Sequence, residues 1–287
     1  MMSPDQTRAV LAWHVLAGVD ETLAENPVDG FNVTDASPPA VLPPKAPRSV
    51  EDSQATTAIA GAPLSVPTSA VTPSPAMPPP SGEESIKTAV HLAEAAATFD
   101  DLHQALKSFD GCALKKTATN LVFTDGNPKG RVLLIGEAPG AEEDRQGTPF
   151  VGPSGRLLDK MLAAIGLDRD DVLISNTVFW RPPGNRTPTP QEAATCQPFL
   201  ERLVELMEPA IIVPMGGPAA KSLLAETMGI GKLRGRWFTY TTPRLAHPID
   251  ATPLFHPAYL LRTPAQKRAA WRDLLMIRRR LEEKAAR

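Results

Sequence analysis

The stretch LLIGEAPGAEEDRQGTPFVGPSG, residues 133–155, contains an apolar run and two Gly/Pro-rich turns with an acidic cluster between them. The apolar run stops at Gly136, and an apolar run bounded by glycine and proline predicts a buried strand. The first turn contains Glu137 and the second contains Phe150. Both residues are candidate functional groups, because loops next to strand ends often carry binding and catalytic side chains.

Strands and helices alternate along the chain on both sides of this stretch. Short apolar runs predict strands, and apolar residues at helical spacing predict helices. The predicted strands are residues 120–123, 131–136, 171–176, 210–216, 237–242 and 252–257, and the predicted helices are 83–97, 98–109, 155–167, 189–208, 217–227 and 264–286. The alternation predicts an α/β fold with a parallel or mixed sheet covered on both faces, in which ligands bind at the carboxyl ends of strands.

Three polar residues follow predicted strands at this kind of position. They are Glu137, Asn176 and His256. Each has a structural explanation when taken alone: a solvated loop carboxylate, an amide that satisfies its own turn, and a histidine fixed before a proline. Together with Phe150, which we expect to be exposed in its turn, they can hold a planar heterocycle and hydrolyse a bond to it.

A second glycine-containing turn, GGPAAKS at residues 216–222, superficially resembles a phosphate-binding loop. Ala220 stands where that loop has a glycine before its lysine, and the spacing differs. We therefore interpret residues 216–222 as an ordinary strand-to-helix turn.

The amino-terminal third differs from the rest in composition. Residues 1–25 have helical apolar spacing and an amino-terminal capping pattern, which predicts a helix that either docks on its own domain or binds a protein partner. Residues 26–83 are rich in Pro, Ala, Ser and Thr, and this composition predicts a disordered linker. The predicted folded domain is residues 84–287.

Charge is divided unevenly along the chain, although the formal net charge is only −2. Residues 1–101 carry 13 acidic and 4 basic groups, whereas residues 102–287 carry 19 acidic and 26 basic groups. A basic domain is the electrostatic pattern expected of a nucleic-acid partner.

Cys112 and Cys196 are the only two cysteines, too few for a disulfide framework or a four-cysteine metal site. We find no apolar run of membrane-spanning length and no signal-peptide pattern. We therefore expect a cytoplasmic protein with reduced thiols, without a membrane segment.

Three ordered motifs carry a resemblance to a known family. The segments GEAPGAEEDRQGTPFVGPSGRLLDKML, SNTVFWRPPGNRTPTPQEAATCQPFL and HPAYLLR resemble the family-four uracil-DNA glycosylases over roughly residues 105–280. The resemblance implies a three-layer α/β/α sandwich with a central, mostly parallel sheet. It also implies a monofunctional hydrolase of DNA base excision repair, which releases uracil as the free base and leaves an abasic site.

The resemblance also implies roles for individual residues. Glu137 would activate water and stabilise positive charge on the sugar, and His256 would hydrogen-bond uracil O2 as the base departs. Phe150 would stack on the flipped uracil and Asn176 would bind its edge. Leu260 would be the wedge that enters the base stack, with Tyr259 and Leu261 as alternatives, and Arg262 would hold a phosphate. The implied uracil-binding set is Gly136, Ala138, Phe150 and Asn176, and the implied DNA-binding set is Pro139, Gly140, Pro257, Tyr259, Leu260 and Arg262.

The chain departs from the family at the four cysteines that hold a [4Fe–4S] cluster. Cys112 and Cys196 match two of these positions, whereas Phe109 and Trp180 stand at the other two. We expect no cluster and no other cofactor, because two thiolates do not hold one. We expect the two aromatic rings to fill the vacated volume.

Two alternative functions remain open. A related subgroup traps DNA covalently and carries a histidine in a basic loop, but the corresponding RPPGNRTPTP loop here has none. The other alternative is a non-catalytic DNA-binding protein of the same fold. We expect a monomer whose partner is DNA containing uracil, either single- or double-stranded.

Overall fold

The computed structural model describes residues 82–286. Within this range six strands form one sheet, in the order β1-β3-β2-β4-β6-β5. The strands are β1 (Asp125–Gly126), β2 (Val132–Gly136), β3 (Val172–Asn176), β4 (Ile211–Pro214), β5 (Phe238–Tyr240) and β6 (Ile249–Ala251). The four central strands β3, β2, β4 and β6 run parallel, while β1 and β5 are antiparallel edge strands.

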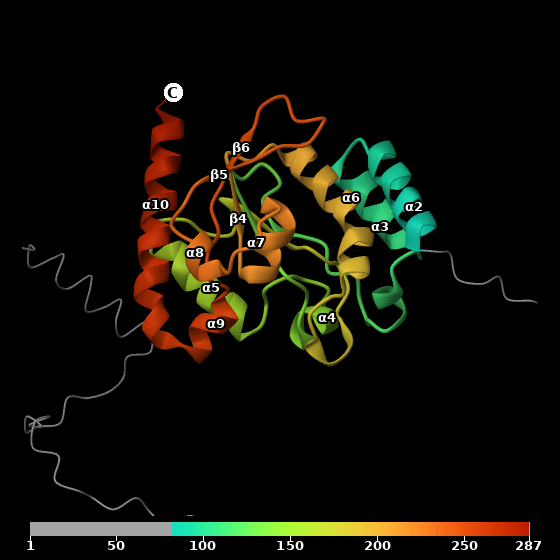
Figure 1. Cartoon of the computed structure of the whole chain (residues 1–287), viewed down its shortest axis with the longest axis horizontal. Helices are drawn as coiled ribbons and strands as arrows, with labels where there is room; N and C mark the ends of the chain where they lie inside the picture. Colours follow the sequence, from blue (N-terminus) through green and yellow to red (C-terminus); the bar gives the residue numbers. More distant parts are fainter. Residues whose placement is uncertain (1–81, 287) are drawn as a thin grey trace, which may run out of the picture. The chain divides into compact units, whose positions relative to one another are not determined.

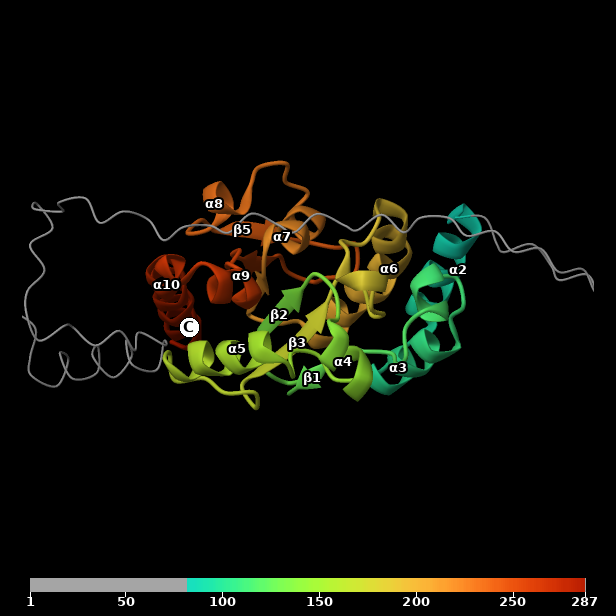
Figure 2. The same cartoon turned by 90° about the horizontal axis from the view of Figure 1, so that it is seen from below.

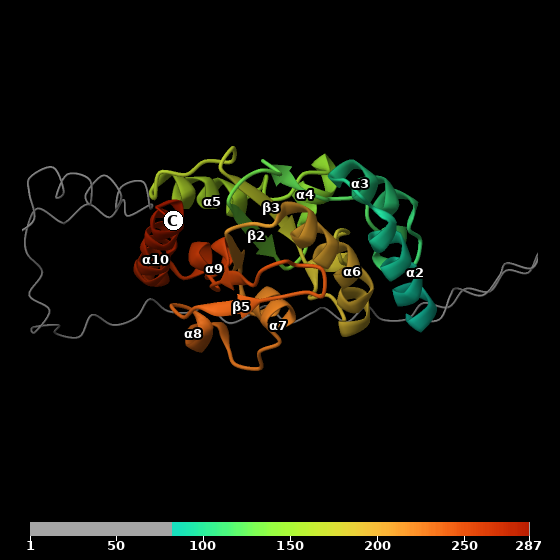
Figure 3. The ribbon, with the colours of Figure 1, turned by 90° about the horizontal axis from the view of Figure 1, so that it is seen from above.

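Helices cover both faces of this sheet (Figures 1 and 2). On one side lie α2 (Gly82–Ala95), α3 (Phe99–Ser108) and α6 (Pro190–Met207), and on the other α5 (Pro153–Ala163), α9 (Pro257–Arg262) and α10 (Lys267–Ala285) (Figure 3). The remaining helices are α4 (Ala141–Gln146), α7 (Gly217–Leu224), α8 (Ile230–Leu233) and the short 3-10 turns Ala113–Lys116, Pro183–Asn185 and Pro264–Gln266. The predicted α/β/α sandwich with a mostly parallel sheet is confirmed.

The central strands explain why the sheet needs two covering layers. All residues of β2 and β3 are buried. Leu133 and Ile135 of β2 pack into the core under α2, α3 and α6, whereas Val132 and Leu134 pack into the core under α5 and α10. Side chains alternate between the faces of a strand, so an unbroken apolar run buries both faces only between two helical layers.

Two helices begin at capping boxes that are visible in the sequence. The Thr98 side chain accepts a hydrogen bond from the Asp101 N–H, and the Asp101 carboxylate accepts one from the Thr98 N–H. Thr189 and Glu192 form the same reciprocal pair at the start of α6. These contacts satisfy backbone donors that a helix start leaves unpaired, and they fix where α3 and α6 begin.

Two predicted strands are wrong in detail. Residues 120–123 form no strand, and β1 lies instead at Asp125–Gly126. The Val122 N–H still donates to the Phe179 carbonyl (2.9 Å), so the segment is held without a ladder. Strand β6 lies just before the predicted range 252–257, at Ile249–Ala251. Within that range Thr252 and Leu254 still donate to the β4 carbonyls of Ile212 and Pro214 (3.0 and 2.9 Å).

The predicted helix at residues 1–25 and nearly all of the predicted linker lie outside the described residues. Helix α2 begins at Gly82, inside the range we assigned to the linker. No helix between residues 82 and 286 has the length and apolar character needed to cross a membrane.

Candidate active site

A cavity of about 580 Å³ opens at the carboxyl ends of the parallel strands. Gly136 at the end of β2 pairs in register with Asn176 at the end of β3. The segment before His256 joins the same edge through a bridge between Leu254 and Met215. The cavity is lined by Glu137, Phe150, Asn176 and His256, the four residues that sequence reasoning singled out as its chemistry.

The other predicted site residues divide into two groups. Ala138, Pro139, Gly140, Tyr259 and Arg262 also line the cavity. Gly136, Pro257 and Leu260 are not among its lining residues in the described part of the chain. Gly136 nevertheless matters to the site, because a Cβ there would lie 2.4 Å from Asn176 Oδ1 and 2.8 Å from the Phe150 ring. Only glycine lets these two side chains approach the end of β2.

Asn176 is 1% exposed, and neither its amide nitrogen nor its amide oxygen has a hydrogen-bond partner within the described residues. An unpaired buried amide is costly, and folded proteins rarely leave one without a reason. It offers one donor group and one acceptor to a ligand in the cavity. This pair of functions is what recognition of a planar amide edge requires.

The turn that carries Glu137 is held from β3. The Thr177 N–H donates to the Gly136 carbonyl (2.9 Å), and the Thr177 hydroxyl donates to the Glu137 carbonyl (2.6 Å). Thr177 is itself buried. Both peptide groups that flank Glu137 are therefore held in place. This fixes the backbone that carries the Glu137 carboxylate at the cavity wall.

His256 is neutral at physiological pH. Burial, reinforced by the positive charge of Arg262 and opposed by Glu143, lowers the pKa of His256 to about 4. Its Nδ1 accepts a hydrogen bond from the Ala258 N–H (3.1 Å). Because Nδ1 is the acceptor, the single proton of the neutral ring lies on Nε2, which is a donor.

Phe150 is buried, not exposed as predicted, with 5% of its surface accessible. It has a φ of 54°, a left-handed conformation that non-glycine residues seldom adopt. Its ring lies 5.5 Å from the His256 ring, with an interplanar angle of 31°. The sequence showed a turn between Pro149 and Gly152, but not that the ring folds inward from it.

Leu260 is also placed differently from the prediction. It is 1% exposed and packs in the core beside α5 and α10, so it is not free to act as a wedge. Leu261 is 43% exposed, and Tyr259 packs on Phe255 (5.1 Å between ring centroids). Helix α9 turns successive side chains to different faces, and its burial pattern was not evident from the motif.

Several residues at the cavity were missed by sequence reasoning. The largest group comes from the RPPGNRTPTP loop, where Pro182, Asn185, Arg186 and Thr187 line the wall. Arg186 forms a two-bond pair with Glu192 (2.6 and 2.8 Å). The GG turn before α7 also lines the cavity, so this strand-to-helix turn borders the site.

The cysteine region, which contains Cys112 and Cys196, lies in the core between the sheet and helices α2, α3 and α6. Cys112 and Cys196 are both buried, and their Sγ atoms are 3.9 Å apart. The hydrogen bond from Cys196 lowers the pKa of Cys112, whereas that contact and burial raise the pKa of Cys196 well above its usual value.

Phe109 and Trp180 are each 2% exposed in the same core, and Phe109 packs on Phe199 (5.1 Å between centroids). The described residues contain no group of three or more His, Cys, Asp or Glu side chains that could hold a metal ion. Two thiols with aromatic rings packed in the same core do not fit a four-thiolate cluster.

Fold and site together define a class of α/β protein. Its pocket lies at the carboxyl ends of the parallel strands and is suited to a planar ring that hydrogen-bonds through its edge. The family model of the uracil DNA glycosylase superfamily matches residues 123–275. The chain belongs to this superfamily.

Curated relatives agree with this assignment. The chain is similar to the type-4 uracil-DNA glycosylase of Archaeoglobus fulgidus, with 40% identity over 58% of this chain and 85% of the relative. The type-4 enzyme of Pyrobaculum aerophilum is 39% identical over 61% of this chain and 90% of the relative. That of Thermotoga maritima is 40% identical over 55% and 81%.

Proposed function

We propose that this chain is a monofunctional uracil-DNA glycosylase that hydrolyses the N-glycosidic bond of uracil in DNA. The observation that carries the proposal is the unpartnered Asn176 amide, buried beside the Phe150 ring at a cavity that Glu137 and His256 also line. Uracil presents adjacent donor and acceptor groups along one edge and has two flat faces. The base enters the cavity after it is flipped out of the helix.

Binding precedes chemistry in this scheme. The Asn176 amide oxygen accepts from uracil N3–H, and its amide nitrogen donates to uracil O4. The Phe150 ring stacks on one face of the base. The two functions of the amide have no partner within the described residues, so a base with the complementary edge gains affinity over one without it.

His256 and Glu137 act on the two sides of the breaking bond. As the C1′–N1 bond breaks, its electron pair moves onto the uracil ring, and the neutral His256 donates Nε2–H to the developing negative charge on O2. The sugar becomes oxocarbenium-like, and the Glu137 carboxylate stabilises its positive charge and orients the water that attacks C1′. The attacking water loses a proton as its oxygen bonds to C1′, and the departing uracil anion takes up a proton, so the products are free uracil and an abasic site.

Contacts to the DNA strand come from the rim of the cavity. Arg262 is exposed there and is suited to a phosphate. Leu261, the exposed apolar residue of α9, takes the place that Leu260 was expected to fill as the wedge. We further propose that the chain works as a monomer, in the cytoplasm, without an iron–sulfur cluster, with Phe109 and Trp180 packed where cluster ligands would stand.

A single incubation tests the activity. Single-stranded DNA with one uracil is mixed with the wild type and, separately, with Glu137→Gln. The wild type should release free uracil, and the variant should lose about 100- to 1000-fold in rate, the usual cost of removing one preorganised electrostatic group. The same oligonucleotide with thymine is the substrate control.

The same incubation tests the alternatives. A stable protein–DNA adduct would support covalent trapping, and tight binding without release of uracil would support a non-catalytic DNA-binding protein. Either result from the wild type overturns the proposal.

A further inference from the structure

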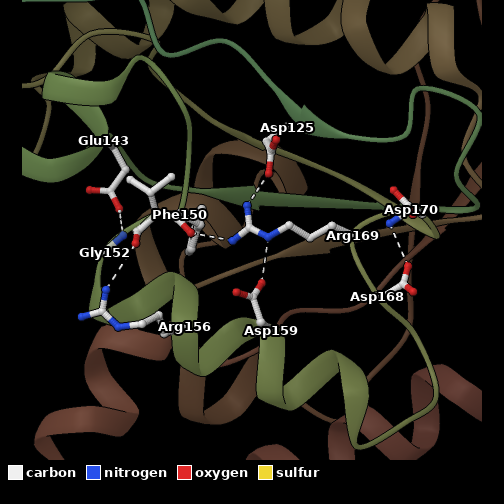
Figure 4. A network of polar contacts seen from close by, with 10 residues as sticks. Asp125, Glu143, Phe150, Gly152, Arg156, Asp159, Asp168, Arg169 and Asp170 are labelled. Carbon is white, nitrogen blue, oxygen red and sulfur yellow. Dashed lines mark hydrogen bonds and ion pairs between the residues drawn. The ribbon is translucent and has the colours of Figure 1, made fainter.

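Phe150 belongs to a segment whose backbone is held by side chains from outside it. Backbone groups of three consecutive residues, in two adjacent peptide units, are bound in this way (Figure 4). The Phe150 carbonyl accepts from Arg169 Nη2 (2.6 Å), the Val151 carbonyl accepts from Arg156 Nη1 (3.5 Å), and the Gly152 N–H donates to Glu143 Oε1 (2.9 Å). The Phe150 conformation is therefore imposed by its surroundings and not by its own preference.

Arg169 makes the shortest of these three contacts, and its guanidinium is fixed on two further sides. Nε donates to Asp159 on α5 (2.8 Å), and Nη1 donates to Asp125 on β1. The side chain is 27% exposed and does not belong to the set of residues that line the cavity. One planar group thus joins β1, α5 and the Phe150 carbonyl, as the fork of donors on arginine allows.

Close backbone packing makes the position of the Phe150 carbonyl narrowly defined. A Cβ on Gly155 would lie 1.6 Å from that carbonyl oxygen, so the first turn of α5 contacts the peptide directly. On the other side, the Phe150 ring contacts the end of β2 at Gly136. A shift of the carbonyl is therefore transmitted to the ring.

Charge argues against a role for Arg169 in holding DNA. Its single positive charge faces two carboxylates, so the group of three side chains is net negative. Such a group does not attract a phosphate. The role that remains for Arg169 is to control the position of the Phe150 carbonyl.

We infer that Arg169 is a positioning residue for uracil excision: held by Asp125 and Asp159, it fixes the Phe150 carbonyl and so the ring on which the base stacks. The inference rests on the proposed function. It assigns no contact between Arg169 and the substrate, and it predicts that the effect of Arg169 on rate passes through Phe150.

The variants are Arg169→Met, which keeps an apolar stem and removes every donor, and Arg169→Lys, which keeps the charge but cannot span three acceptors. Arg202→Met is the matched control. Arg202 is also partly buried, also donates to a backbone carbonyl, that of Ala96 (2.9 Å), and also pairs with a carboxylate, Glu205, but it lies on α6 away from the cavity.

Single-turnover excision from a uracil-containing single strand is measured at a temperature where urea titration shows each variant to be folded. Arg169→Met should reduce the rate about 10- to 100-fold, as expected when the stacked base is held up to about 1 Å from its reactive position. Arg169→Lys should lose most of the same factor, and Arg202→Met should keep the wild-type rate. Affinity for the thymine-containing strand should not change.

A double-mutant cycle with Phe150→Ala separates positioning from general support of the fold. In the Phe150→Ala background, Arg169→Met should change the rate less than about twofold, because the ring it positions is absent. If Arg169→Met does not fold, Arg169→Lys and Asp159→Asn are carried through the same cycle.

Two results overturn the inference. One is a wild-type rate in Arg169→Met or Arg169→Lys, and the other is a loss that multiplies fully with that of Phe150→Ala. A wild type that releases no uracil would instead overturn the proposed function.

Discussion

The uracil pocket and the cysteine region lie in the same domain, but they differ in how their polar groups are paired and in how their volume is filled. At the pocket, a buried amide is left unpaired and an aromatic residue is held in a left-handed conformation. In the cysteine region, two thiols contact each other and aromatic rings share their core. The pocket therefore retains features that cost stability and that a bound ligand can relieve. The cysteine region is instead packed in a way that favours the folded state.

Trp180→Ala should produce the largest change in stability. Loss of a buried tryptophan typically costs about 3–5 kcal/mol, through lost transfer energy and the cavity that remains. Urea unfolding measures this directly. Uracil excision at low temperature, where the variant is still folded, should persist. A variant of unchanged stability would show that the ring does not fill the region as packing material.

Asn176→Leu should shift stability in the opposite direction. It removes a buried amide that has no partner within the described residues, and relief of that penalty should stabilise the fold by about 1–3 kcal/mol. The same change should reduce excision by at least about 100-fold, since recognition of the uracil edge is lost. A destabilised variant would mean that the amide is satisfied in the free protein, and the contrast between the regions would weaken.

His256 should make the free energy of unfolding depend on pH. The pKa of His256 is about 4 in the folded chain, against 6.5 for the free side chain. Its contribution is fully present above pH 6.5 and is lost as pH falls toward 4, because the unfolded chain then binds a proton that the folded chain does not. The loss should total about 3 kcal/mol.

Unfolding titrations between pH 7 and pH 4 measure this loss. His256→Asn, which keeps an acceptor for the Ala258 N–H but does not titrate, is the matched control and should lose about 3 kcal/mol less than the wild type over that interval. Parallel pH profiles for the two proteins would contradict the assignment.

Changing both cysteines to serine should have the smallest effect, a loss of about 1 kcal/mol with excision retained. Iron analysis of anaerobically purified wild type is the companion measurement. Negligible iron together with full activity agrees with an aromatic core in place of a cluster. Roughly four iron atoms per chain, or collapse of the serine variant, would reverse the interpretation of this region.

Much of the site was predictable because strand ends are visible in a sequence. Glu137 and Asn176 follow apolar runs directly, and parallel strands bring such ends together. The burial of Phe150 was not predictable, because it depends on glycines at 136 and 155 that become neighbours only in the folded chain. Arg169 was missed for a related reason: its three acceptors come from separate segments, and no local spacing signals them.

The in-register pairing of Gly136 with Asn176 has a consequence for how this enzyme fails when heated. The turn that carries Glu137 and the Asn176 side chain both start from the same paired position of the parallel β2–β3 ladder. A strand cannot slide by one residue without exchanging its two faces, and both faces of β2 are buried. The spacing between the two groups is therefore either native or lost altogether. Thermal inactivation should follow the melting of the β2–β3 pair as a single sharp step, with no weakened form of the enzyme at intermediate temperatures.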